Sequence, residues 1–105
     1  MMIVVTSEEA FKVLLSHHEK VAVDFSATWC GPCEEVSPKF EAMSLEYPEI
    51  VFCNVDIDQQ PLVSEKAGVR SVPTFQAYLN GDKKDESQGA DIAKLKRLVE
   101  ELNNA

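Results

Sequence analysis

The chain has 105 residues, 45% of them hydrophobic and 27% charged, a composition typical of a soluble globular protein rather than a disordered one. This length predicts a single domain over residues 1–105, large enough to bury a core without additional cross-links. Ten Lys and Arg residues against 18 Asp and Glu residues give a formal net charge of −8, so we expect no nucleic-acid partner. No apolar run reaches the length of a membrane span, so we expect no membrane partner.

The N-terminus and the cysteine content both bear on the cellular compartment. Residues 1–5 lack a basic start and are too short for a secretion signal, so we expect a cytoplasmic protein. Three cysteines are too few, and odd in number, for a secreted disulfide scaffold. Cys30 and Cys33 form one Cys-x-x-Cys, and Cys53 stands alone. In a reducing compartment such a pair is more often catalytic or metal-binding than structural.

Hydrophobic periodicity predicts the first elements. Residues 1–5 form a short strand, and residues 7–17 form an amphipathic helix with Thr6 as its N-cap. Residues 21–25 are a nearly continuous apolar run, which is typical of a strand covered on both faces.

The middle of the chain repeats this alternation. Residues 33–47 have helical spacing, and Pro38 inside them is expected to kink the helix because it lacks a backbone N–H. Residues 50–55 predict a second buried strand. Residues 61–67 predict a short helix that stops at Gly68.

The last third predicts a hairpin and a helix. Residues 74–79 alternate as a strand, Asn80-Gly81 is a strong hairpin-turn signal, and residues 83–88 form a polar edge strand. Asp91 is expected to cap a final helix with four inward-facing residues, Ile92, Leu95, Val99 and Leu102. The order β-α-β-α-β-α-β-β-α predicts the α/β class, with a mixed five-stranded sheet and helices on both faces.

The segment 27–33, Ala-Thr-Trp-Cys-Gly-Pro-Cys, is the part of the sequence that indicates most about its chemistry. It follows a predicted buried strand and opens a helix, where unpaired N–H groups and the helix dipole favour the thiolate of Cys30. The two-residue spacer keeps the two sulfurs close enough to bond and release. Pro32 begins the helix, where its missing N–H costs little, and Gly31 leaves room for a partner's backbone.

The alternatives for the cysteine pair are a structural disulfide and half of a zinc site. A structural zinc site requires four ligands, and only Cys53 and the neighbouring His17 and His18 remain. The predicted elements place these residues elsewhere. The spacing therefore favours redox chemistry, with no metal bound.

These residues together resemble the thioredoxin family. The resemblance rests on Trp29-Cys-Gly-Pro-Cys33 after a buried strand, on Asp24 within that strand, and on Val72-Pro73-Thr74 further along. It extends over essentially the whole chain in motif order and spacing, and it includes Pro38, Asn80-Gly81 and Gly89. The segment 23–33 is more similar to eukaryotic members than to bacterial ones. The resemblance implies a thioredoxin fold.

The resemblance also implies a role for each site residue. Cys30 would attack a substrate disulfide, and Cys33, the more buried cysteine, would resolve the mixed disulfide. Asp24, beneath the pair, would accept and return the proton of Cys33, with a pKa raised by burial. Pro73 would be cis and would place the Val72 backbone beside Cys30 to pair with an extended substrate. The docking surface around the sulfurs would consist of Trp29, Gly31, Pro32, Val72, Gly89 and Ala90.

The implied function is the reduction of protein disulfides by a monomeric protein. It would bind no cofactor, and its redox-active group would be the Cys30–Cys33 disulfide. Electrons would come from NADPH through a separate thioredoxin reductase, and clients would resemble peroxiredoxins, ribonucleotide reductase or methionine sulfoxide reductase. Two other functions stay open: a redox-dependent binding module that regulates a partner, and an oxidase or isomerase of the secretory pathway. Gly31-Pro32, where isomerases usually carry Gly-His, argues against the last.

Two positions depart from the family pattern. Glu34 stands where the family usually has Lys, and we hypothesise that it raises the Cys30 pKa and makes the disulfide more reducing. Asn54 stands where bacterial members have a Lys near the buried aspartate, so the raised Asp24 pKa would depend on desolvation.

Simpler interpretations apply to several of these residues. Alone, Asp24 would be an ordinary polar residue at a strand end, and Trp29 a core aromatic. Cys53 alternates with apolar strand residues, so we expect a buried, inert thiol, whereas a regulatory thiol would need exposure. His17 and His18 complement the negative end of a helix.

Overall fold

The computed structural model describes residues 2–105 and contains, within them, one five-stranded sheet and four helices in the predicted order. The elements are β1 (Met2–Val4), α1 (Glu8–His17), β2 (Lys20–Ser26), α2 (Gly31–Met43), β3 (Val51–Asp56), α3 (Pro61–Lys66), β4 (Thr74–Leu79), β5 (Asp82–Gln88) and α4 (Ile92–Asn103). The strand order is β1-β3-β2-β4-β5. β1, β3 and β2 run parallel, whereas β4 and β5 pair antiparallel, so the predicted mixed sheet is confirmed.

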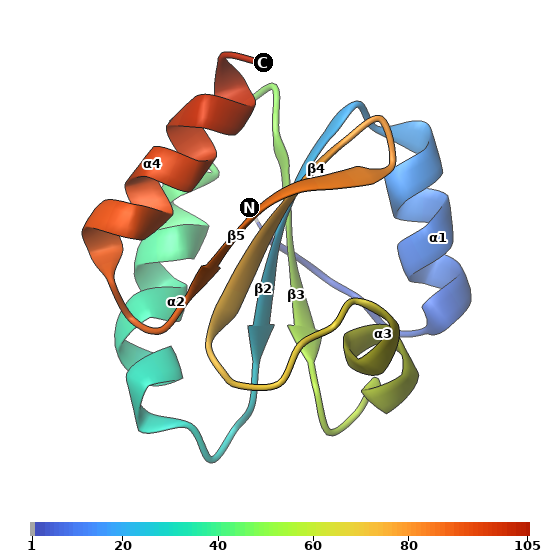
Figure 1. Cartoon of the computed structure of the whole chain (residues 1–105), viewed down its shortest axis with the longest axis vertical. Coiled ribbons are helices and arrows are strands. Elements are labelled where there is room, and N and C mark those ends of the chain that lie inside the picture. Colours follow the sequence, from blue (N-terminus) through green and yellow to red (C-terminus); the bar gives the residue numbers. More distant parts are fainter. Residues whose placement is uncertain (1) are drawn as a thin grey trace.

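The helices cover the two faces of the sheet in pairs. Figure 1 shows α2 and α4 on one face and α1 and α3 on the other. Because side chains alternate along a strand, β2 directs Val21, Val23 and Phe25 toward α1 and α3. It directs Ala22 and Asp24 toward the opposite face, where Asp24 meets α2. This alternation places a carboxyl group beneath the helix that begins at the cysteine pair.

Each face has its own hydrophobic core. Beneath α2 and α4, the ring of Phe40 packs 4.9 Å from that of Phe52 and 5.2 Å from that of Phe75, centroid to centroid. Beneath α1 and α3, Phe11 meets the ring of Tyr78 edge-on at 6.0 Å. Both cores contain residues of the central strand β2, so they hold the strand that carries Asp24 from both sides.

Two predictions about the helices are wrong. Ser7, not Thr6, caps α1: its Oγ accepts the Ala10 N–H at 3.0 Å, because the helix begins one residue later than the pattern indicated. α2 begins at Gly31 and ends at Met43 rather than spanning 33–47, since Cys30 serves as its N-cap. Pro38 lies inside α2 as expected, and the predicted kink stays a prediction.

The C-terminal predictions are largely confirmed. Asn80 and Gly81 both have positive φ, 52° and 86°, as a tight hairpin turn with the twist of the strands requires. Asp91 caps α4 by accepting the Lys94 N–H at 3.1 Å. Besides the predicted residues, Leu98 is also buried on α4.

The predicted first strand is only partly tested. Its first residue, Met1, lies outside the described residues, and Val5 follows the end of β1 as a buried residue.

None of the helices within residues 2–105 combines the length and the apolar character needed to cross a membrane.

Candidate active site

The two cysteines of the Cys-x-x-Cys lie at the first turn of α2 and form a disulfide, with their Cα atoms 5.3 Å apart. Cys30 is the N-cap, and its Sγ accepts the Cys33 N–H at 3.2 Å. A sulfur that already accepts a helix N–H is stabilised as a thiolate when the disulfide opens. The pair therefore has the electrostatic surroundings of a reactive dithiol.

Cys33 was expected to be more buried than Cys30, but the observed difference in exposure is small. Cys30 is 4% exposed and Cys33 3% exposed in the disulfide form. Both cysteines form a buried cluster with Ala27, and Ile57 and Val72 pack against this cluster. What distinguishes the cysteines is position: Cys30 precedes the helix, whereas Cys33 lies within its first turn, on the helix that contacts Asp24.

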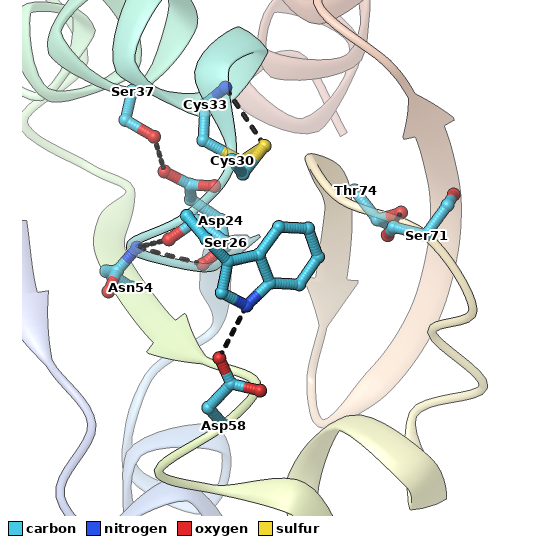
Figure 2. Close-up of a disulfide and its surroundings, with 10 residues drawn as sticks. Asp24, Ser26, Cys30, Cys33, Ser37, Asn54, Asp58, Ser71 and Thr74 are labelled. Carbon is cyan, nitrogen blue, oxygen red and sulfur yellow. Dashed lines mark hydrogen bonds between the residues drawn. A yellow bond between two sulfur atoms is a disulfide. The ribbon is translucent and has the colours of Figure 1, made fainter.

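Asp24 is fully buried on β2 beneath this turn. Ser37, one turn after Cys33, donates its hydroxyl to Asp24 Oδ2 at 2.6 Å. The other carboxyl oxygen, Oδ1, is also buried and accepts no hydrogen bond from the described protein atoms. Figure 2 shows the carboxyl group below the disulfide, with Oδ2 turned toward Ser37.

Burial is the main cause of an unusual Asp24 titration. Desolvation raises the pKa of Asp24 to about 6, and the Ser37 hydroxyl and, less strongly, the Asn54 amide oppose that rise. Asn54 lies beside Asp24 in the β2–β3 register, and its amide donates to the Asp24 backbone carbonyl at 3.3 Å and to Ser26 Oγ at 2.8 Å. No cation contributes to this pKa among the described residues. The prediction that Asn54 leaves desolvation dominant is confirmed.

A polar recess opens beside Cys33. Its volume is about 350 Å³. Cys33, Ser37 and Asn54 line it, and the carboxylates of Glu34 and Asp56 belong to its wall. The flank of Cys33 and the groups around Asp24 are therefore close to water.

The loop before β4 closes the other side of the disulfide. The Val72–Pro73 peptide bond is cis, as predicted, and Val72 packs against the cysteine cluster. Thr74 Oγ1 donates to the Ser71 carbonyl at 2.7 Å, and the Gly89 N–H donates to the Pro73 carbonyl at 2.8 Å. These bonds bring the segments containing Val72 and Gly89 together.

The predicted docking residues differ in exposure. Trp29, Gly31, Pro32 and Ala90 are exposed, Val72 and Gly89 are half-buried, and Pro73 is buried. The structure brings Val72 against the cysteines and Gly89 against Pro73. Trp29 is 68% exposed beside Cys30, so it is not a core aromatic.

Besides Ser37, sequence reasoning missed two residues of this region. Asp58 accepts the Trp29 indole N–H at 2.8 Å (Figure 2). Ile57 packs against the cysteine cluster. Both follow the end of β3. The indole of Trp29 could have indicated Asp58, because the N–H of a Trp side chain usually has a hydrogen-bond acceptor. A carboxylate that follows a neighbouring parallel strand is placed to be that acceptor.

The remaining candidates lie outside the site. Cys53 is fully buried on the α1–α3 face, where desolvation raises its pKa to about 12, so the expectation of a buried thiol is confirmed. His17 and His18 lie at the end of α1, away from α2. Within residues 2–105, no group of three or more His, Cys, Asp or Glu residues is arranged to hold a metal ion.

The chain is similar to known proteins over nearly its whole length. A family model described as Thioredoxin matches residues 2–103. "Thioredoxin 1" of Plasmodium falciparum is 43% identical over 100 residues, which are 95% of this chain and 96% of the relative. "Thioredoxin-1" of Schizosaccharomyces pombe is 42% identical over 95 residues, covering 90% and 92%.

Solved structures agree with these relatives. A structure of Plasmodium falciparum thioredoxin superposes with a TM-score of 0.93 at 42% identity and covers 95% of this chain and 98% of its own. The spacing of the Cys30–Cys33 disulfide, directly after Trp29, is consistent with the Trp-Cys-x-x-Cys motif of this family. The chain therefore belongs to the thioredoxin family and is a thiol–disulfide oxidoreductase that reduces protein disulfides with a dithiol.

Proposed function

We propose that Cys30 is the nucleophile of this reaction and Cys33 the resolving thiol. The observation that carries the proposal is the position of the disulfide at the N-terminus of α2, with Cys30 as N-cap. In the reduced protein, the Cys30 thiolate attacks a client disulfide and releases one client thiolate. Cys33 then attacks Cys30 Sγ, the Cys30–Cys33 bond forms, and the second client sulfur leaves.

Asp24 serves as the base for the second step. Cys33 is a thiol in the mixed disulfide, and its proton must leave before its sulfur can attack. Burial raises the pKa of Asp24 to about 6, which makes this carboxylate a stronger base than an exposed one while leaving it mostly ionised at pH 7.

The client docks on the surface around the disulfide, formed by Trp29, Gly31, Pro32, Val72, Pro73, Gly89 and Ala90. Support comes from the contacts of Val72 with the cysteines and of Gly89 with Pro73. Gly31 has open space around its Cα, so a client backbone is able to approach Cys30 closely. An extended client segment would hydrogen-bond to the Val72 backbone.

The wider setting follows the family. We infer that a separate thioredoxin reductase passes electrons from NADPH to the Cys30–Cys33 disulfide, and that the protein works as a monomeric electron carrier in the cytoplasm. Peroxiredoxins and ribonucleotide reductase are the classes of client we propose, with no nucleic-acid partner. Residues 1–105 would act as one domain, as the single sheet joining β1 to β5 suggests.

Cysteine variants test the assigned roles. Reduction of insulin disulfides, driven by NADPH and a thioredoxin reductase, should fall at least about 100-fold in Cys30→Ser and in Cys33→Ser, because each variant lacks one half of the exchange. Cys33→Ser should accumulate a stable mixed disulfide through Cys30. Cys53→Ala, the control for loss of a thiol, should keep its activity. A trapped complex on Cys30→Ser rather than Cys33→Ser would reverse the roles.

The buried carboxyl predicts a pH-dependent stability. Because the folded state raises the Asp24 pKa from 3.8 to about 6, its contribution to stability is complete below pH 4 and is lost as pH rises toward 6. Relative to Asp24→Asn, the wild type should lose about 3 kcal/mol of unfolding free energy between pH 3 and pH 8. Urea unfolding at each pH measures this difference, and a difference that does not vary with pH would contradict the assignment.

A substitution of Glu34 tests how charge at the start of α2 affects the Cys30 pKa. Its carboxylate is exposed in the first turn of α2, where it opposes the formation of the neighbouring Cys30 thiolate. Glu34→Lys should lower the Cys30 pKa by about half a pH unit in a thiol-alkylation titration. Glu101→Lys, which changes the net charge equally near the end of α4, should have no effect. An unchanged Cys30 pKa in Glu34→Lys would refute the hypothesis.

A further inference from the structure

Ser37 is unusual among the helical serines of this chain. Serines inside helices commonly donate their hydroxyl to a backbone carbonyl three or four residues earlier. Ser16 and Ser64 do so, at 2.9 Å and 3.0 Å. Ser37 instead donates to the Asp24 carboxyl on β2, at 2.6 Å. Because a hydroxyl has one hydrogen, this bond occupies the whole donor capacity of Ser37, and its length is that of a charge-assisted hydrogen bond.

The bond makes the two oxygens of Asp24 unequal. Oδ2 accepts the Ser37 hydroxyl, whereas Oδ1 is buried without a hydrogen-bond donor among the described residues. In Figure 2 the Oδ1 side of the carboxyl is turned toward the cysteine pair. A carboxylate held at one oxygen has a fixed orientation, and its free oxygen is the stronger proton acceptor.

We propose that Ser37 is a positioning residue for disulfide exchange: its hydrogen bond to Asp24 Oδ2 stabilises the ionised carboxyl group and leaves Oδ1 free to receive the Cys33 proton. The inference rests on the proposed role of Asp24 as base. In the step concerned, the Cys33 S–H proton passes to Oδ1, the Cys33 sulfur attacks Cys30 Sγ, the Cys30–Cys33 bond forms, and the client sulfur leaves with the electron pair of the broken bond.

Among the groups around Asp24, Ser37 makes the strongest side-chain hydrogen bond to its carboxyl group. On α2 the groups near Asp24 are Cys33 and Ser37 itself, and β4 places Phe75 opposite it in the register. On β3, Asn54 lies beside Asp24 in the register, and its amide lowers the Asp24 pKa less than Ser37 does. Cys53 lies on the other face of the sheet, with its pKa raised to about 12 by burial.

The remaining charged groups lie in the recess wall. Glu34 and Asp56 line it from α2 and β3, and both are anionic side chains that oppose ionisation of a nearby carboxyl group. No described cation takes part in the Asp24 titration. The Ser37 hydroxyl therefore supplies the stronger, and the Asn54 amide the weaker, of the two side-chain interactions that favour the ionised carboxyl group.

The test follows the resolving step alone. Reduced protein is mixed rapidly with dithiobis(nitrobenzoate). One thionitrobenzoate is released when Cys30 attacks the reagent, and a second is released when Cys33 attacks Cys30 Sγ. The rate of this second phase does not depend on the reagent concentration. In Ser37→Ala, the midpoint of the pH dependence of the second-phase rate should rise by about one pH unit, because one charge-assisted hydrogen bond to Asp24 is lost. The second phase should then be about fivefold slower at pH 6 and nearly unchanged at pH 8.

Two matched variants separate positioning from folding. Ser37→Thr retains the hydroxyl and should restore the wild-type pH profile. Ser64→Ala removes a serine hydroxyl from α3, away from Asp24, and should leave the profile unchanged. An unshifted profile in Ser37→Ala, an equal slowing at every pH, or a failure of Ser37→Thr to restore the midpoint would each overturn the proposal.

Asp24→Asn distinguishes failure of this inference from failure of the proposed function. If Asp24→Asn resolves as fast as the wild type at pH 7, the role of Asp24 as base is wrong, and the Ser37 inference falls with it. If Asp24→Asn is slow and Ser37→Ala is normal at pH 6, only the Ser37 inference is wrong. Because Ser37 acts through Asp24, adding Ser37→Ala to Asp24→Asn should change the rate no further.

Discussion

The burial of one carboxyl group under the first turns of α2 is the constraint on which the site depends. Asp24 is fully buried because the alternation of β2 turns it toward the face that α2 and α4 cover. Leaving a charge there is costly, so the group holds its proton up to a pH of about 6. The stability lost at neutral pH is the cost of burying a carboxyl group beneath the disulfide.

The remaining parts of the site are held by neighbouring elements. The N-terminus of α2 positions Cys30 as its cap, and the loop ending at Pro73 is tied to Gly89 at the end of β5. Val72 packs against the cysteines from that loop, and Trp29 is fixed by Asp58 after β3. Four segments far apart in sequence thus meet at one end of the sheet, and a client disulfide would reach the sulfurs between them.

Most of the fold was predictable because its signals are local. The apolar run of β2, the Asn80-Gly81 turn and the Asp91 cap each depend on a few adjacent residues. The α1 cap was misplaced by one residue because Thr6 and Ser7 are both good caps, and only packing decides between them. The site residues came from the family resemblance. Ser37 and Asp58 were missed because their partners lie on other elements, which periodicity does not reveal.

The central claim is that Cys30 and Cys33 form a reducing dithiol. The most direct measurement is the reduction potential of their disulfide, obtained by equilibration with glutathione or a reference thioredoxin. Thioredoxin itself has a potential of about −270 mV, a reference value for the family rather than a result of this structure. The account predicts a potential near or below about −270 mV. A potential of about −180 mV or higher, in the range of isomerases and oxidants, would contradict it.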